Sequence, residues 1–352
     1  MVWHMALWLC HGPSPSACAP RTMRQPSISE LLRPPRASTD APLQIVDLFC
    51  GAGGFSTGAV QAGHELVLAV DASYDALRTH RANHPRCEHL LAELPLPASD
   101  LPLPRNGRPW HLHGSPPCQH FSMMQSRVAG AEGEREQAAS DAHTLVEWYL
   151  QLALASDAAS WSMEQVATPL MRKLAERVRR AHPRAMAWGV FDLSLLGVPQ
   201  TRRRLIAGTP ALVARLRRLE SHARRRSVRD VLGAAACRGT HLRSAKRWAK
   251  ARLRHLRRPG ETKYVTSHPP AGSLLHHHSV DGPAPTVCCS GWLTWHHTGR
   301  QLTGLRCIHT KHLALLQTFP ATYKWPRAAT RRRRLIGNAL PCLVARLLMQ
   351  RV

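Results

Sequence analysis

A cysteine in a proline-containing stretch is the residue best suited to covalent chemistry. Cys118 ends the run Gly114-Ser115-Pro116-Pro117-Cys118, which follows directly after a strand expected over Trp110–His113. The two prolines restrict the backbone, so the loop should hold the thiol in a defined, accessible position, as a nucleophile requires. A cysteine taken alone is more often buried and structural. The chemistry of Cys118 therefore depends on partners elsewhere in the chain.

A glycine-rich turn is the second feature with chemical potential. It lies within Asp47–Ser56, after an apolar run of strand type and before a helical segment. Glycines at such a turn let backbone N–H groups approach a bound nucleoside closely. Phe49 offers a face for an adenine ring, and Asp71, after the next expected strand, could accept hydrogen bonds from ribose hydroxyls. A turn of this kind is also common as a plain connection between a strand and a helix.

The elements that must position these residues alternate along the chain. Apolar runs with strand character are separated by stretches with helical spacing, a rhythm typical of a doubly wound, mostly parallel α/β sheet. The expected strands are 43–49, 66–70, 110–113, 161–166, 185–191 and 204–208, and the expected helices begin near 56 and cover 141–155 and 169–181.

Composition divides the chain into segments. Residues 1–42 are rich in Pro, Ser and Arg and predict a disordered leader, with an over-extended reading frame or a transit peptide as alternatives. Residues 43–209 should form a catalytic and cofactor-binding domain. Residues 210–305 are basic and lack the helix and strand rhythm, so we expect a separate nucleic-acid-binding lobe there. Residues 306–352 return to helical spacing and should rejoin the first domain.

Charge indicates the class of partner. The chain has 48 Lys and Arg against 22 Asp and Glu, a formal net charge of +26, which favours a polyanion such as nucleic acid. An Arg-rich composition without nucleic-acid binding is the alternative. Ten cysteines without repeated C-x-x-C spacing indicate a reducing, intracellular compartment. Since no run of 18 apolar residues exists, we expect a soluble protein with no membrane partner.

Six segments together resemble the cytosine-C5 DNA methyltransferase family, in its motif order. The resemblance spans residues 45–208 and 306–350 and leaves the leader and the basic lobe unmatched. It implies a Rossmann-like class I methyltransferase sheet with a smaller, basic target-recognition domain. The matching segments are Asp47–Ser56, Gly114–Gln119, Glu164–Val166 for the family's Glu-Asn-Val, Gln200–Arg204 for its Gln-x-Arg-x-Arg, Leu316–Pro320 and Gly337–Pro341.

The resemblance implies a mechanism with four catalytic residues. Carbon 5 of cytosine is too weak a nucleophile to attack a methylsulfonium, so the family first adds a cysteine thiolate to carbon 6; Cys118 matches that cysteine. Glu164 matches the glutamate that relieves charge at N3, and Arg204 the arginine that holds O2. Arg202 should brace the site or contact a phosphate.

The resemblance also implies the cofactor and the partners. The cofactor is S-adenosyl-L-methionine, and the substrate is double-stranded DNA with the target base turned out of the helix. Residues His120–Ser140 are expected to form a mobile loop that closes over the flipped base. We expect a monomer, with a cognate restriction endonuclease as a further partner and no metal. The implied cofactor residues are Phe49, Gly51, Gly53, Asp71, Glu93, Pro117 and Asn338.

The chain departs from the family pattern at a few positions. Asp71 stands where glutamate is usual, Gln165 replaces asparagine, and Lys311-His312 replaces Arg-Glu. Gln165 and His312 should loosen the scaffold, because buried partners of a lost group would be left unpaired.

Three alternatives to this function remain open from the sequence. One is a DNA-binding relative that has lost turnover, and another is a transfer RNA cytosine-C5 methyltransferase. A third is a zinc-binding module built from Cys288-Cys289 and His296-His297, although this segment lacks paired C-x-x-C geometry.

Overall fold

We describe the fold from a computed structural model of the protein, over residues 41–117, 132–220, 225–233, 240–241, 262–266, 277–289, 293–298 and 302–350. For residues 132–142, 240–241, 262–266, 277, 293–298 and 302–307, the description covers the backbone alone. None of the helices in these ranges has both the length and the apolar character that crossing a membrane requires.

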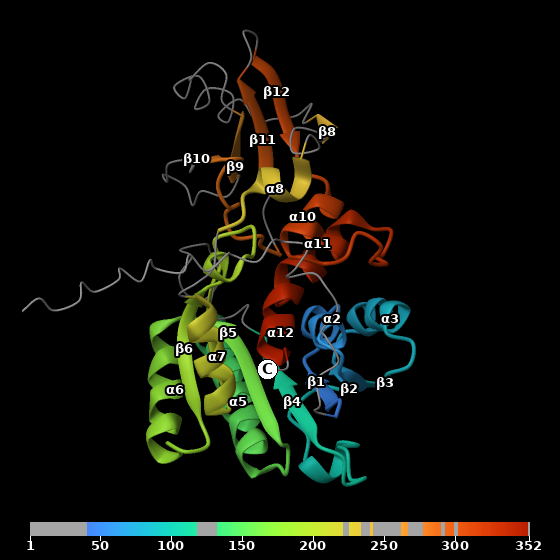
Figure 1. The fold of residues 1–352 in the computed structure, drawn as a ribbon, viewed down its shortest axis with the longest axis vertical. Helices are drawn as coiled ribbons and strands as arrows, with labels where there is room; N and C mark the ends of the chain where they lie inside the picture. The colour runs from blue at the N-terminus through green and yellow to red at the C-terminus, as the bar shows by residue number, and fades with distance from the viewer. Residues whose placement is uncertain are drawn as a thin grey trace, which may run out of the picture. The chain divides into compact units, whose positions relative to one another are not determined.

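A seven-stranded sheet forms the centre of the larger domain (Figure 1). The first five strands in sheet order run parallel, and the last two pair antiparallel. This mostly parallel α/β sheet confirms the predicted fold class. In sheet order the strands are β3 (Glu88–Leu91), β2 (Glu65–Asp71), β1 (Gln44–Leu48), β4 (Trp110–Gly114), β5 (Ser160–Val166), β7 (Arg203–Gly208) and β6 (Ala187–Asp192).

Helices cover both faces of this sheet because its central strands bury both sides. All five residues of β1 are buried, and Ile45 packs into one core cluster while Val46 packs into the other. The first cluster includes side chains of α2 (Gly54–Gln61), α3 (Tyr74–Asn83), α7 (Pro210–Glu220) and α12 (Cys342–Met349). The second includes α5 (Glu132–Ala155) and α6 (Pro169–Ala181). Figure 1 shows α5 and α6 together on one side of the sheet.

A second, five-stranded antiparallel sheet lies within the segment that the sequence marked as basic and without rhythm. The sequence analysis did not predict these strands, because they are short and rich in His, Thr and Lys rather than in alternating apolar residues. In sheet order they are β10 (His277–Ser279), β9 (Thr262–Thr266), β11 (Leu293–Thr298), β12 (Leu302–Cys307) and β8 (Thr240–His241).

α7 begins at the expected domain boundary, residue 210. Leu212, Val213 and Leu216 of α7 are buried in the first core cluster, against the same layer as α12. The helical layer of α2 and α12 therefore includes α7, because the apolar face of this helix needs the sheet to cover it. Three shorter helices complete the chain: α8 (Val228–Leu232), α10 (Thr310–Leu316) and α11 (Ala329–Asn338).

The expected loop over His120–Ser140 is wrong in its second half. Residues 118–131 lie outside the described part of the chain, whereas α5 begins at Glu132, nine residues before the expected helix start. The sequence from Glu132 to Ala139 contains Glu, Arg, Gln and Ala, which are good helix formers and outweigh the glycine among them.

The contact between α2 and α12 depends on a glycine. A Cβ atom built on Gly58 would lie 2.3 Å from the carbonyl oxygen of Cys342 and 2.5 Å from the Cβ of Ala345. Since both neighbours belong to the packed core, Gly58→Ala should lower the free energy of unfolding by about 1 to 3 kcal/mol. Urea unfolding measures this change. Gly282→Ala is the control, because its nearest neighbour, the Ser279 carbonyl oxygen, lies at 3.6 Å; equal loss in both variants would contradict the packing argument.

Candidate active site

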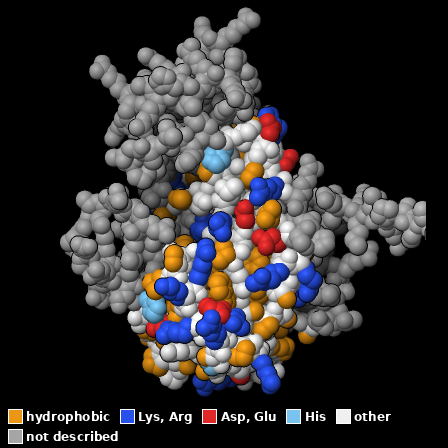
Figure 2. Space-filling view, turned by 90° about the vertical axis from the view of Figure 1, so that its left-hand side faces the viewer, with side chains coloured by type: hydrophobic (Ala, Val, Ile, Leu, Met, Phe, Trp, Pro, Cys, Tyr) orange, Lys and Arg blue, Asp and Glu red, His pale blue; other side chains and the backbone are white. Residues whose placement is uncertain are grey.

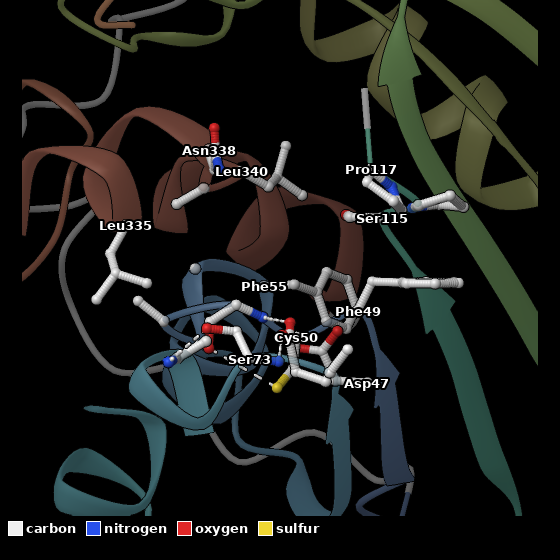
Figure 3. A pocket seen from close by; sticks show the side chains of 18 of the residues that line it. Asp47, Phe49, Cys50, Phe55, Ser73, Ser115, Pro117, Leu335, Asn338 and Leu340 are labelled. Carbon is white, nitrogen blue, oxygen red and sulfur yellow. Dashed lines mark hydrogen bonds between the residues drawn. The ribbon is translucent and has the colours of Figure 1, made fainter. Parts of the chain in front are cut away.

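A pocket of about 410 Å³ opens at the carboxyl edge of the parallel strands. This is the edge where ligands bind in open α/β sheets. Figure 3 shows Asn338 and Leu340 across the pocket from Asp47 and Cys50. Of the residues expected to bind cofactor or to act in catalysis, Phe49, Gly51, Asp71, Glu93, Pro117, Glu164 and Asn338 line it.

The turn after β1 shapes the floor of this pocket. Phe49, Gly51 and Gly53 have φ angles of 57°, 54° and 87°, in the left-handed region that favours glycine. The backbone N–H of Gly51 donates to Oδ2 of Asp71 at 2.8 Å, which ties the turn to the end of β2. Phe49, in contrast, is a bulky residue in this region and carries strain. Its ring lines the pocket and contacts Trp148 edge to face at 6.2 Å.

Gly53 does not line the pocket itself, unlike the expectation that it contacts cofactor. Its φ angle and its neighbours explain why it is glycine: a Cβ here would lie 2.9 Å from Cδ2 of His80 and 3.0 Å from the hydroxyl of Tyr323. Gly53 therefore allows α2 to begin close to α3, and it acts on the pocket through the course of the turn.

Asp47 is a pocket residue to which the sequence analysis assigned no role. Its Oδ2 accepts a hydrogen bond from the Ser56 hydroxyl at 2.5 Å, and that hydroxyl also bonds Nε2 of His80 at 2.9 Å. Burial raises the pKa of Asp47 to about 7. Within the described residues, Oδ1 has no hydrogen-bond partner although it is buried. A carboxylate at the end of an otherwise apolar strand was the available signal in the sequence.

Glu164 and Arg204 form a buried ion pair beside the pocket. They come from the neighbouring antiparallel strands β5 and β7, in which Val166 pairs with Arg204. Nε of Arg204 lies 2.6 Å from Oε1 of Glu164, and the side chains are only 12% and 9% exposed. The structure thus brings two predicted catalytic residues together, with Glu164 facing the pocket. A pair this enclosed keeps a defined geometry, since separating the charges would leave each one desolvated.

Arg202 occupies a different place from Arg204. Its guanidinium is buried and donates to the carbonyl oxygens of Val287 at 3.1 Å, Gly337 at 3.1 Å and Ala339 at 3.2 Å. These bonds join the start of β7 to two distant segments of the chain. Of the two roles expected from the sequence, the geometry favours bracing, because a phosphate would have no access to this side chain.

Gln165 makes two side-chain hydrogen bonds at the position where the sequence analysis expected a loosened scaffold. The side chain is fully buried; Nε2 donates to the carbonyl oxygen of Pro116 at 3.2 Å, and Oε1 accepts from the N–H of Val166 at 2.7 Å. The bond to Pro116 reaches the loop that leads to Cys118. Cys118 itself lies outside the described residues.

For the methyl transfer that the sequence resemblance implies, we expect Gln165→Leu to lower the rate by about 10-fold, since it leaves the Pro116 carbonyl without its buried donor, a loss of about 1 to 3 kcal/mol. Steady-state kinetics of methyl transfer to duplex DNA measure this loss. Gln165→Asn should retain more activity than Gln165→Leu, because it keeps an amide. Identical activities of the two variants would show that the hydrogen bond does not matter.

His312 lies in α10, where it is mostly buried, and desolvation lowers its pKa to about 4. Its Nδ1 has no partner among the described residues. This unpaired atom belongs to His312 itself, so the expectation that partners of the lost carboxylate are left unpaired stays a prediction. The His309 ring packs edge to face against it at 5.8 Å.

A buried row of polar side chains connects the sheet to the pocket. His111 bonds Ser160 at 2.7 Å and Ser162 at 2.9 Å, and His113 bonds Ser162 at 2.8 Å and Ser115, a pocket residue, at 2.9 Å. The ring of Phe55 in α2 stacks on His113 with centroids 3.5 Å apart. Both histidines are almost fully buried, and this burial lowers their pKa values.

The neutral histidines should make the protein acid-sensitive. Burial lowers the pKa of His111 to about 3, so the unfolded chain takes up its proton first, and stability present above pH 6.5 is lost as the pH falls. At pH 5.5 each such histidine costs about 1.4 kcal/mol of unfolding free energy. Urea unfolding at pH 7.5 and 5.5 measures this. His111→Gln should reduce the pH difference by that amount, whereas the exposed control His182→Gln should preserve it; no reduction in His111→Gln would refute the assignment.

The described fold is the Rossmann-like fold that class I methyltransferases share. The solved Dnmt2 methyltransferase of S. pombe has a TM-score of 0.56 at 16% sequence identity, covering 87% of this chain and 96% of that chain. A DNMT2 mutant of Spodoptera frugiperda gives 0.54 at 15% identity, covering 87% and 99%. At such identities the likeness concerns the fold alone.

The protein belongs to the C-5 cytosine-specific DNA methylase family, which it matches over residues 43–149 and 220–352. The type II methyltransferase M.HgiDI of Herpetosiphon aurantiacus is 27% identical over 313 residues, 86% of this chain and 92% of that protein. M1.HphI of Haemophilus parahaemolyticus is 24% identical over 333 residues, 88% and 86% of the two chains. These matches confirm the family that the six motifs indicated.

Proposed function

We propose that the protein transfers a methyl group from S-adenosyl-L-methionine to carbon 5 of a flipped-out cytosine in double-stranded DNA, through a covalent bond between Cys118 and carbon 6. One observation carries the proposal. A single pocket joins the glycine turn and Asp71, which suit a nucleoside, to Glu164 and to Ser115–Pro117, the residues that lead directly into Cys118.

The pocket suits a cationic, nucleoside-containing cofactor. Phe49 offers an aromatic wall, Asp71 and Glu93 offer carboxylates, and the unpartnered Oδ1 of Asp47 is a buried acceptor in the same space. Acidic groups in a partly enclosed pocket favour a ligand that bears ammonium and sulfonium charge. The bound cofactor would supply an electrophilic methyl group. Asn338 completes the lining from the side of α11.

In the proposed mechanism the thiolate of Cys118 adds to carbon 6 of the cytosine, and Glu164 stabilises the charge that develops at N3 by a hydrogen bond or proton. Nε of Arg204 lies 2.6 Å from Oε1 of Glu164, and in this mechanism Arg204 would bind O2 of the base. After methylation the proton at carbon 5 passes to a water molecule, the electrons of that C–H bond re-form the double bond between carbons 5 and 6, and the bond between carbon 6 and sulfur breaks to regenerate the thiolate.

The proposed partners follow from the same function. We propose that the basic segment after α7, including the five-stranded sheet, recognises the DNA sequence. A cognate restriction endonuclease is proposed because the relatives bear type II methyltransferase names. The zinc alternative rests in part on His296 and His297, whose side chains lie outside the described residues. A monomer acting on DNA inside the cell remains the expected form.

One experiment tests the function directly. The purified protein is incubated with labelled S-adenosyl-L-methionine and with duplex DNA or transfer RNA, and bisulfite sequencing then maps the modified cytosines. We expect label in DNA at carbon 5 of cytosines within a short recurring sequence. Label only in transfer RNA would support the RNA methyltransferase alternative, and absence of label in both would support a relative without turnover.

A further inference from the structure

A second pocket, of about 670 Å³, lies between α3 and the segment that leads into α11. It shares no lining residue with the candidate active site, although both pockets border the same two helices. On α11 the turn containing Arg331 faces this pocket, whereas Arg334 faces the active site. The proposed methyl transfer makes no use of it. We call it the basic pocket.

Positive charge dominates the basic pocket. Arg78, Lys324, Arg327 and Arg331 line it, and Asp75 is the one acidic residue in its lining. Asp75 is already occupied, since its Oδ1 lies 3.0 Å from Nη1 of Arg331. The described part of the chain offers no carboxylate within ion-pair distance of the other three cations. Like charges that converge on one hollow repel each other unless an anion lies between them.

The walls of the basic pocket are built by specific contacts. The side-chain amide of Asn83 donates to the Lys324 carbonyl oxygen at 2.9 Å, and its Oδ1 accepts from the Lys324 N–H at 2.8 Å. The Trp325 ring packs against Phe319 and Tyr323, with centroids 4.9 Å away in each case. These contacts hold the loop against α3, so the cations are presented without a large rearrangement.

The start of α11 adds to the attraction for anions. Ala328 precedes the helix and lines the pocket, no side chain caps the helix, and its first turn contains no acidic residue. Free N–H groups at a helix start carry partial positive charge and bind phosphate oxygens well. The start of α11 thus adds to the attraction that Arg78, Lys324 and Arg327 exert on an anion in the pocket.

We propose that the basic pocket binds the phosphodiester backbone of duplex DNA, as an anchoring site separate from the active site and from the basic segment after α7. Arg78, Lys324 and Arg327 would contact neighbouring phosphates, and Trp325 would pack against the sugar. The pocket is far larger than one phosphate group requires, which favours an extended backbone over a free phosphate. The inference takes DNA as the partner and does not depend on the chemistry of Cys118.

The basic face of α6 provides a comparison surface. Figure 2 shows Lys and Arg side chains gathered on the face that includes α6. There, however, Arg177 pairs with Glu147, and Arg179 and Arg180 pair with Glu176. Charges already neutralised by neighbours gain less from a phosphate. Basic side chains outside the basic pocket, including those of α6, therefore serve as controls for the removal of positive charge.

The test compares two triple variants that each remove three positive charges. The pocket variant is Arg78→Gln/Lys324→Gln/Arg327→Gln, and the control variant is Arg105→Gln/Lys173→Gln/Arg184→Gln, all six positions being exposed. Fluorescence anisotropy follows binding of a labelled 30-base-pair duplex without cofactor, from about 50 to 300 mM NaCl. Because each lost phosphate contact lowers the slope of log affinity against log salt by about 0.9, the pocket variant should lose about 2 to 3 and the control less than about 1.

The possible outcomes separate this inference from the proposed function. The same titration is repeated with transfer RNA as the probe. Equal salt slopes in the two variants, or a lower slope in the pocket variant with transfer RNA but not with DNA, would overturn the basic pocket as a DNA site. Thermal unfolding and binding of S-adenosyl-L-methionine should match wild type in both variants, which excludes misfolding as the cause. A wild-type protein that binds DNA in this manner but never methylates it would contradict the proposed function alone.

Discussion

The Cys118→Ala variant is expected to lose methyl transfer to DNA by a factor on the order of 10⁴ or more, as removal of a covalent nucleophile does in other enzymes. Without a thiolate to add at carbon 6, the cytosine ring stays aromatic and carbon 5 remains too weak a nucleophile. Incorporation of labelled methyl groups measures the loss. The substitution removes only the thiol of Cys118 and leaves the pocket residues Ser115–Pro117 in place. Binding of DNA and of S-adenosyl-L-methionine should therefore persist.

A trapped complex provides the second measurement for Cys118. In a duplex that carries 5-fluorocytosine, no proton can leave carbon 5, so the covalent bond should persist through denaturation. Mass spectrometry of the wild-type complex should place the adduct on Cys118, and the alanine variant should form none. An adduct on another cysteine, or turnover in the Cys118→Ala variant, would refute the assignment.

The Glu164→Gln variant is expected to reduce kcat by about 10² to 10⁴, the range for a positioned general acid or base. Glutamine can still donate an N–H hydrogen bond to N3 but cannot supply the proton that assists addition at carbon 6. It also leaves the Arg204 guanidinium, only 12% exposed, without its counter-charge. Single-turnover kinetics with saturating cofactor should therefore show the loss in the chemical step more than in KM.

Glu147→Gln is the matched control for this prediction. It removes one carboxylate of α5 that pairs with Arg177 of α6, and this carboxylate does not line the pocket. Its kcat should stay within about twofold of wild type, because exposed ion pairs contribute little. If Glu164→Gln retained wild-type kcat, or if both variants fell equally, Glu164 would not have the proposed role.

The sheet and its order of elements could be predicted because their signals are local. β1, β2, β4 and β5 lie within one or two residues of the expected runs, since each of these buried strands carries large apolar residues in a short segment. β3 was missed because Glu88–Leu91 is short and only half apolar. The extension of α5 back to Glu132 was missed because it has no apolar stripe, so that helix propensity was the available signal.

The candidate site was predicted from sequence motifs. Their order along the chain does not show which of their residues line the pocket or what each one contacts. Asp71 and Glu93, far apart in the sequence, both reach the pocket because parallel strands end at one edge of the sheet. Gln165 was expected to loosen the scaffold, yet its longer side chain bonds Pro116 and Val166 together. Whether one extra methylene fits depends on the backbone across the strand, which no single segment of sequence reveals.

The sequence by itself determined the fold class, the family and the identity of the residues that can do chemistry, because each depends on short segments with a regular period or a motif. The tertiary structure decided what each residue touches. Arg202 and Arg204 stand two positions apart in one basic run, yet one is sealed among backbone carbonyls and the other holds Glu164. Likewise, Arg78 and Lys324 meet in the basic pocket only because α3 and the loop before α11 pack together. Spacing along the chain gives no measure of such distances, since they are set by how distant elements bury their apolar faces.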